Sequence, residues 1–156
     1  MKRISILVLC LFFMTFGLYA QSNPNDSINQ VFQMLYRIAD GEAVQGFTWN
    51  GKVGKQKIDV PTVNSAEIQI DRSNANPIIT LTLEGKRDVL SLLYNDYKMY
   101  INNSGGRVIP DVTFSIDGVD LSGWYVRHYV VTIAFFYSGP QVQKTGNCSL
   151  VIGVKR

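Results

Sequence analysis

Four residues in the second half of the chain carry side chains suited to binding: Trp124, Tyr125, Arg127 and Tyr129. These residue types dominate binding hot spots, and an arginine between two tyrosines can clamp a carboxylate or stack against a sugar. Because alternate residues of a strand share a face, Tyr125, Arg127 and Tyr129 are expected to form one surface. The competing interpretation is structural, with Tyr129 in the core and the stem of Arg127 along apolar surface.

The sequence gives little support for nucleophilic catalysis or for a metal site. His128 is the sole histidine and Cys148 the only cysteine outside the first twenty residues, so a site built from His and Cys ligands is not expected. A Ser-His-Asp or Cys-His enzyme would have to use His128, yet no Gly-x-Ser-x-Gly turn is present. We therefore assign no catalytic residue, no metal ligand and no cofactor.

Charged side chains cluster in two places. Asp111, Asp117 and Asp120 lack the alternating oxygen ligands and closing Glu of a calcium loop, and are better explained as turn residues. Paired acids for glycoside chemistry leave no sequence spacing to read, so that option stays open. The lysine ridge formed by Lys52, Lys55 and Lys57 is interpreted as protection of a sheet edge.

One amphipathic helix is predicted near the start of the domain. Apolar residues recur at steps of three and four from Ile28 to Ala39, which places them on one helical face. Ser27 and Gln30 match a capping box, and Gly41 suits the left-handed position that ends helices. We expect this helix to pack on a sheet.

Period-two alternation with frequent turn residues predicts antiparallel strands from Gly46 onward. Asn50-Gly51 is a strong hairpin signal, and a second turn is expected at Gly85-Lys86. Residues 88–102 fit either a helix or two strands, and strands are favoured. Further strands are predicted at 63–70, 79–84, 112–116 and 148–154.

The segment 124–137 is predicted to be one long strand, apolar on both faces and therefore central in the sheet. The helix would cover one face, and a folded-over part of the sheet or a partner would cover the other. The expected fold class is thus α+β and β-rich. An N-terminal amphipathic helix would pack on a largely antiparallel, curled sheet or partly closed barrel of seven to nine strands.

Residues 1–20 read as a secretory signal peptide, with Lys2 and Arg3 before an apolar run, so 21–156 is expected to be a single β-rich domain. The junction at Ala20 resembles those of many secreted bacterial proteins. Without the leader, 13 basic and 12 acidic side chains remain, a net charge of +1. Such a balance gives no reason to expect nucleic acid as a partner, and no stable membrane insertion is expected after cleavage.

The leading hypothesis is a secreted or periplasmic, non-catalytic domain that binds a protein or glycan component of the envelope, or an extracellular ligand. The runner-up is a small carrier of an apolar ligand. Gly46-Phe47-Thr48-Trp49 after a helix resembles the Gly-x-Trp pattern of lipocalins, although that pattern has one intervening residue and a later helix. A small secreted hydrolase comes third.

Overall fold

The computed structural model describes residues 24–156, so the predicted signal peptide at residues 1–20 lies outside the described residues. The helices are α2 (Pro24–Ala39), α3 (Arg87–Asn103), the short α4 (Pro140–Thr145) and the 3-10 helix η2 (Pro110–Val112). The strands are β1 (Thr48–Asn50), β2 (Val53–Ile58), β3 (Ser65–Asp71), β4 (Ile78–Gly85), β5 (Arg107–Val108), β6 (Phe114–Ile116), β7 (Val119–Val126), β8 (Tyr129–Phe136) and β9 (Cys148–Lys155). Of the helices in this range, none is long and apolar enough to cross a membrane.

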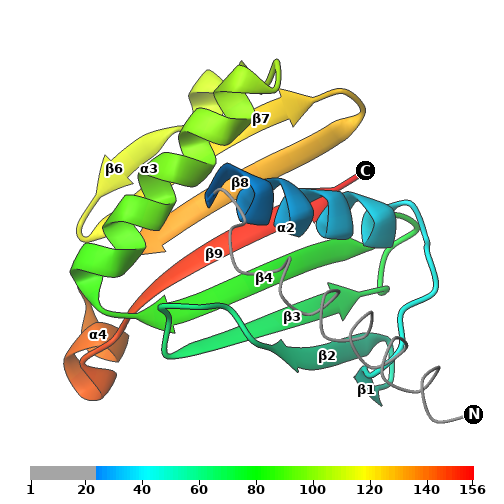
Figure 1. Cartoon of the computed structure of the whole chain (residues 1–156), viewed down its shortest axis with the longest axis horizontal. Coiled ribbons are helices and arrows are strands. Elements are labelled where there is room, and N and C mark those ends of the chain that lie inside the picture. The colour runs from blue at the N-terminus through cyan, green and yellow to red at the C-terminus, as the bar shows by residue number, and fades with distance from the viewer. Residues whose placement is uncertain (1–23) are drawn as a thin grey trace, which may run out of the picture.

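The nine strands form one antiparallel sheet in the order β1-β2-β3-β4-β9-β8-β7-β5, with β6 paired to β7 beside this path. β9 lies between β4 and β8 although it comes last in the sequence (Figure 1). The predicted hairpin joins β1 to β2, but its turn is Gly51-Lys52 and not Asn50-Gly51, because Asn50 pairs with Val53. Gly51 has the positive φ that such a turn requires. The prediction of an α+β, β-rich fold is confirmed.

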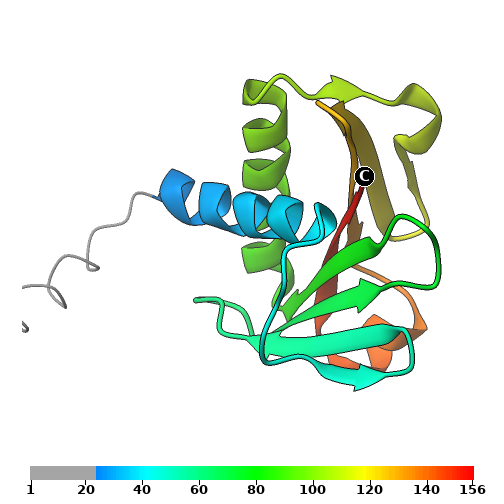
Figure 2. The same ribbon diagram turned by 90° about the vertical axis from the view of Figure 1, so that its right-hand side faces the viewer.

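Helices α2 and α3 cover the same face of the sheet and cross each other (Figure 2). The apolar stripe of α2 is buried as predicted, and Gly41 ends the helix with a φ of 90°. The predicted start is wrong, because the helix begins at Pro24 and Ser27 lies inside its first turns. Together the two helices bury the apolar face of five neighbouring strands, which in sheet order are β3, β4, β9, β8 and β7.

Residues 88–102, for which strands were favoured, belong to helix α3. Its buried residues are Leu90, Tyr94, Tyr97 and Ile101, spaced at steps of four, three and four. The period-two pattern through Met99 was misleading, since Met99 is 58% exposed and lies on the outer face of the helix. The hairpin turn expected at Gly85-Lys86 is absent, because a helix and not a strand follows it. The chain passes there from β4 to α3.

The prediction of one long strand over 124–137 is also wrong. Arg127 and His128 form a two-residue turn between β7 and β8, in which Val126 pairs with Tyr129. Because such a turn returns both flanking residues to the same face, Trp124 and Val126 join Tyr129 and Val131 beneath the helices. Counting straight through the turn had placed Trp124 and Val126 on the opposite face.

The sheet is neither closed nor strongly curled, so the predicted curled sheet or partly closed barrel is wrong. The turn between β7 and β8 explains the difference, because it changes which of their residues face the helices. The large apolar residues of β7 and β8 lie mainly on the helix-covered face. The second face carries half-buried residues such as Thr132 and Ala134, which do not require a second layer. We call this second side the open face of the sheet.

One segment does approach the open face: the arm formed by β5, η2 and β6, which crosses β7 at Gly123. A Cβ atom at Gly123 would lie 3.0 Å from Val112 Cγ1, so glycine allows the arm to pack directly on the strand. Ser122 and Gly123 both lie inside β7, which begins at Val119, before the strand predicted from residue 124.

Candidate functional site

The four residues predicted to bind are distributed over three places. Trp124 is buried under α3, where its Nε1 donates a hydrogen bond to Asn102 Oδ1 at 2.9 Å. Tyr129 lies on the same covered face at the end of β8. Tyr125 lies on the open face and is 48% exposed, and Arg127 is in the turn. The single surface expected for Tyr125, Arg127 and Tyr129 does not exist.

Around the β7–β8 turn, polar groups from separate elements meet at Asp40, which follows the C-terminus of α2. Tyr129 donates its hydroxyl hydrogen to Asp40 Oδ2 at 2.6 Å, and His128 Nε2 lies 3.5 Å from Oδ1. Arg156 Nη1 lies 3.9 Å from the same oxygen. The rings of Tyr36 and Tyr129 stack with centroids 4.4 Å apart. We call these residues the Asp40 cluster.

The electrostatics of the Asp40 cluster follow from these contacts. The hydrogen bond from Tyr129 lowers the pKa of Asp40, with smaller contributions from His128 and Arg156. Burial, followed by the neighbouring Asp40 carboxylate, raises the pKa of Tyr129 to about 12. Burial likewise raises the pKa of Tyr36 to about 12. A charged carboxylate and a neutral phenol are thus the preferred forms at neutral pH, which suits a structural tie between helix and hairpin.

Arg127 stands apart from this tie. Within the described residues, its guanidinium makes no ion pair or hydrogen bond, and its backbone has a φ of 55°. The side chain is exposed at the tip of the hairpin. A binding role for Arg127 therefore remains a prediction, and the Asp40 cluster beside it has a structural explanation.

The open face carries the larger surface for binding. Strand register places Ile116, Val119 and Phe136 in one cross-strand row, and Phe114, Leu121, Ala134 and Val151 in the next. Of the eight large apolar side chains exposed in the described residues, four lie on this face: Phe114, Ile116, Tyr125 and Phe136. We call the residues of these two rows the open-face patch. An exposed apolar surface of this kind is typical of an interaction site.

A hollow of about 460 Å³ lies at one end of the patch, where α4 forms its wall. Val119, Phe136 and Val151 come from the patch, and Pro140 and Val142 come from α4. Hydroxyl groups from Thr82, Ser138 and Ser149 complete the lining, together with Asp117. We call this feature the α4 hollow; it can take an apolar side chain and offers hydrogen-bonding groups around it.

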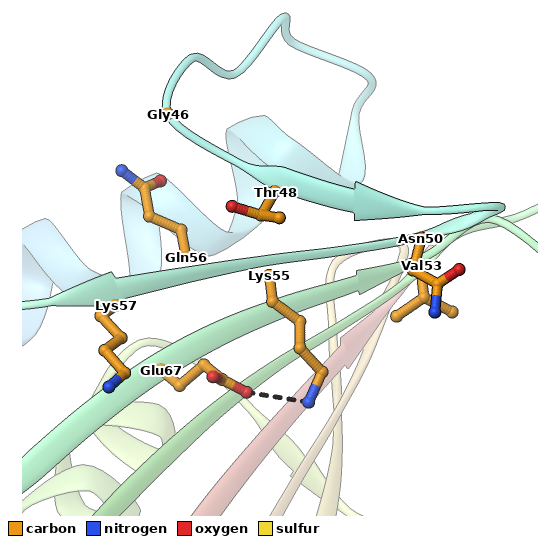
Figure 3. A pocket seen from close by; sticks show the side chains of 8 residues that line it. All are labelled: Gly46, Thr48, Asn50, Val53, Lys55, Gln56, Lys57 and Glu67. Atoms are coloured by element: carbon orange, nitrogen blue, oxygen red, sulfur yellow. Dashed lines mark ion pairs between the residues drawn. The ribbon is translucent and has the colours of Figure 1, made fainter.

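A second, larger groove of about 790 Å³ lies along β1 and β2 (Figure 3). Polar and charged residues line it, with Thr48 on β1, Gln56 on β2 and Glu67 on β3, but most of the surface that they present is apolar. Lys55 and Glu67 point toward one another and form an ion pair at 3.1 Å. This pair compensates the charge of Lys55 only. Lys57 also lines the groove and makes no ion pair within the described residues, so the predicted lysine ridge keeps a net positive charge.

The remaining candidates for chemistry do not converge. Asp111 lies in η2, Asp117 in the β6–β7 turn, and Asp120 in β7 with a hydrogen bond from the Ser115 hydroxyl. In the part of the chain that the structure describes, no group of three His, Cys, Asp or Glu residues could hold a metal ion. Cys148 is buried and free, facing the helices.

The apolar residues of the open-face patch were not selected from the sequence. Val112, Phe114 and Ile116 alternate as a strand should, and Phe136 was assigned to a strand buried on both faces. The alternation marks an apolar face, but it does not say which face the helices leave uncovered. Only the placement of α2 and α3 identifies these side chains as exposed.

Comparisons with protein-family models, curated proteins and solved structures found no match for this chain. The function of this chain is therefore inferred from the geometry of its described residues.

Proposed function

We propose that this chain is an exported, non-catalytic binding domain that holds a component of the cell envelope against the open face of its sheet. The observation that carries the proposal is the open-face patch, in which Phe114, Ile116 and Phe136 are exposed on neighbouring strands. Export is supported by the leader-like residues 1–20.

The open-face patch has the composition of an interface core. Its centre is aliphatic and aromatic, while charged residues such as Glu84 and Arg107 lie at its margins. Tyr125 extends the patch toward β5 and is the one predicted binding residue that lies on this face. Rigid strands carry all these side chains, so the entropy lost on binding is small.

The other two hypotheses remain predictions. The sheet does not close into a barrel, so a carrier of an apolar ligand would use the α4 hollow or a hollow of about 320 Å³ between α2 and the sheet, where Met34, Phe47 and Ile58 are among the lining residues. For a hydrolase, His128 is the only histidine, and its Nε2 faces Asp40. Among the described residues no serine, threonine or cysteine is hydrogen-bonded to His128.

A retention assay tests the proposal. Purified chain is mixed with envelope vesicles from its native host and sedimented, and the bound fraction is measured. We expect the double variant Ile116→Ser, Phe136→Ser to lower retention by about tenfold or more, since central apolar anchors dominate interfaces. Its melting temperature should stay close to that of the wild type.

The matched control is Leu92→Ser, Met99→Ser, which removes two exposed apolar side chains from the outer face of α3. This control should be retained like the wild type. Equal loss in both double variants would indicate nonspecific adhesion of apolar surface, and no loss in either would refute the proposal.

A further inference from the structure

The charges around the α4 hollow have one sign. Asp117 is the only charged residue in its lining. Glu84 lies on the same open face, paired across β4 and β9 with Ser149, which also lines the hollow. Lys144, the nearest base along α4, is outside the lining. The lining of the apolar hollow therefore holds one carboxylate and no cation, and Glu84 supplies a second carboxylate next to the lining residue Ser149.

The opposite end of the same face is basic. Register places Arg107, Tyr125 and Lys155 in one row, about six residues or roughly 20 Å along the strands from the row of Glu84. In β3, Asp71 belongs to the same row as Arg107 and Lys155. The Ser73 backbone N–H donates a hydrogen bond to the Asp71 carboxylate. The face thus has an acidic end at α4 and basic side chains at the other end.

We propose that the segment bound in the α4 hollow is both apolar and cationic: a stretch of a partner protein in which an aliphatic or aromatic side chain is flanked by lysine or arginine. This inference rests on the proposed function and names the chemistry of the partner. Phe136, Val119 and Val151 contact the apolar side chain. Asp117 and Glu84 pair with the flanking cations, and such complementarity selects partners more than it adds affinity.

A protein segment fits this site better than a small free ligand. The α4 hollow is open to solvent, whereas small-molecule sites enclose most of the ligand surface. The apolar surface also continues past the hollow to Ile116 and Phe114 on the edge strand β6. A segment several residues long can contact both.

Two fluorescein-labelled peptides test the inference by fluorescence anisotropy at low salt. One has the sequence lysine-leucine-phenylalanine-leucine-lysine, and the other replaces both lysines with glutamate. We expect the wild type to bind the lysine peptide about fivefold more tightly or better, because exposed charge pairs contribute modestly. The double variant Asp117→Asn, Glu84→Gln should lose this preference.

Asparagine is suited to position 117, since it tolerates the positive φ of 47° found there. Asp111→Asn is the control, because it removes a carboxylate of η2 that is outside the hollow. It should leave the preference unchanged. Equal affinity of both peptides for the wild type, or an equal effect of the control, would overturn the inference.

The two proposals can fail separately. If retention by vesicles depends on Phe136 while the peptides bind equally, the binding function stands and the partner chemistry is wrong. If retention does not depend on Phe136, the binding function itself fails. A dimer in sedimentation equilibrium that Ile116→Ser, Phe136→Ser dissociates would show that a second copy covers the face, which also overturns the inference.

Discussion

The two faces of the sheet use the same strands in opposite ways. On the covered face, Ile68, Leu81, Ile152 and Ile133 form a cross-strand row in which each side chain is at most 1% exposed. One residue along each strand, the open face carries Glu67, Thr82, Val151 and Ala134, all half-buried. Large aliphatic residues thus fill the row that the helices cover, whereas the open-face row combines a carboxylate, a hydroxyl and two smaller aliphatic side chains.

This contrast makes the open-face patch informative. If the open face were apolar throughout, an exposed phenylalanine would mean little. Its central strands carry Thr80, Thr132 and Gly153 instead. Three of the four exposed large apolar residues of this face lie toward β6 and the adjoining end of β8, and Tyr125 lies toward the other end of β7. A local concentration of large apolar residues, on a face whose other side chains are mostly smaller, favours a binding role.

The largest expected effect separates the faces by stability. Trp124→Ala should lower the free energy of unfolding by about 3–5 kcal/mol, because it leaves a cavity under α3 and frees Asn102 from its hydrogen bond. Phe136→Ala on the open face should cost less, about 1 kcal/mol, because Phe136 is 37% exposed and loses only part of the burial of a core residue. Urea denaturation measures both, and a comparable cost at Phe136 would mean that the patch is structural.

An intermediate effect concerns the covered face at high pH. Tyr36, Tyr97 and Tyr129 have pKa values raised to about 12 in the folded chain, mainly by burial. Between pH 10 and 12 the unfolded chain loses these protons while the folded chain keeps them, so stability should fall over that window. Below pH 10 this contribution is fully present.

Tyr129→Phe sharpens this prediction. The variant lacks the hydroxyl bonded to Asp40, so it should be less stable at neutral pH and should lose less stability between pH 10 and 12. Thermal unfolding across pH, together with tyrosinate absorbance, provides the measurement. Parallel pH profiles for variant and wild type would show that Tyr129 does not contribute to the alkaline transition.

The smallest effect is expected at the hairpin tip. Arg127→Gly should raise stability by about 0.5 kcal/mol, since glycine adopts the positive φ of this turn without strain but costs more entropy on folding. Arg127→Ala should leave the melting temperature nearly unchanged, because the guanidinium has no polar partner within the described residues. A drop of many degrees for Arg127→Ala would assign it a structural role.

Local signals in the sequence were sufficient where neighbouring residues determine the conformation. The stripe of α2 and the hairpin between β1 and β2 each depend on neighbouring residues, and both were predicted correctly, although the turn lies one residue later than predicted, at Gly51-Lys52. The Arg127-His128 turn has no glycine or asparagine to reveal it, so the hairpin was missed. Helix α3 was missed because Tyr97, Met99 and Ile101 alternate as in a strand, while Tyr97 and Ile101 are also spaced as on one face of a helix. Only tertiary packing decides between the two conformations.

The candidate site was less predictable than the fold. Residue type identified Tyr125 and Arg127 as suited to binding. The β7–β8 turn, however, places Tyr125 and Tyr129 on opposite faces of the sheet and Arg127 at the hairpin tip. The exposure of Phe136 depends on where two helices lie, which is a long-range property. Sequence patterns therefore gave the kinds of side chain involved and did not determine the face on which they meet.

The position of β9 sets the order in which this domain can be completed. Strands β1–β4 and β5–β8 pair within their own halves, but the two halves are joined in the sheet only through β9. Its pairing with β4 brings together residues about seventy positions apart, a slow closure in which chain entropy is lost before contacts are gained. Until residues 148–155 arrive, the covered core has a gap through its centre. The complete sheet therefore cannot form until the last strand has been synthesised.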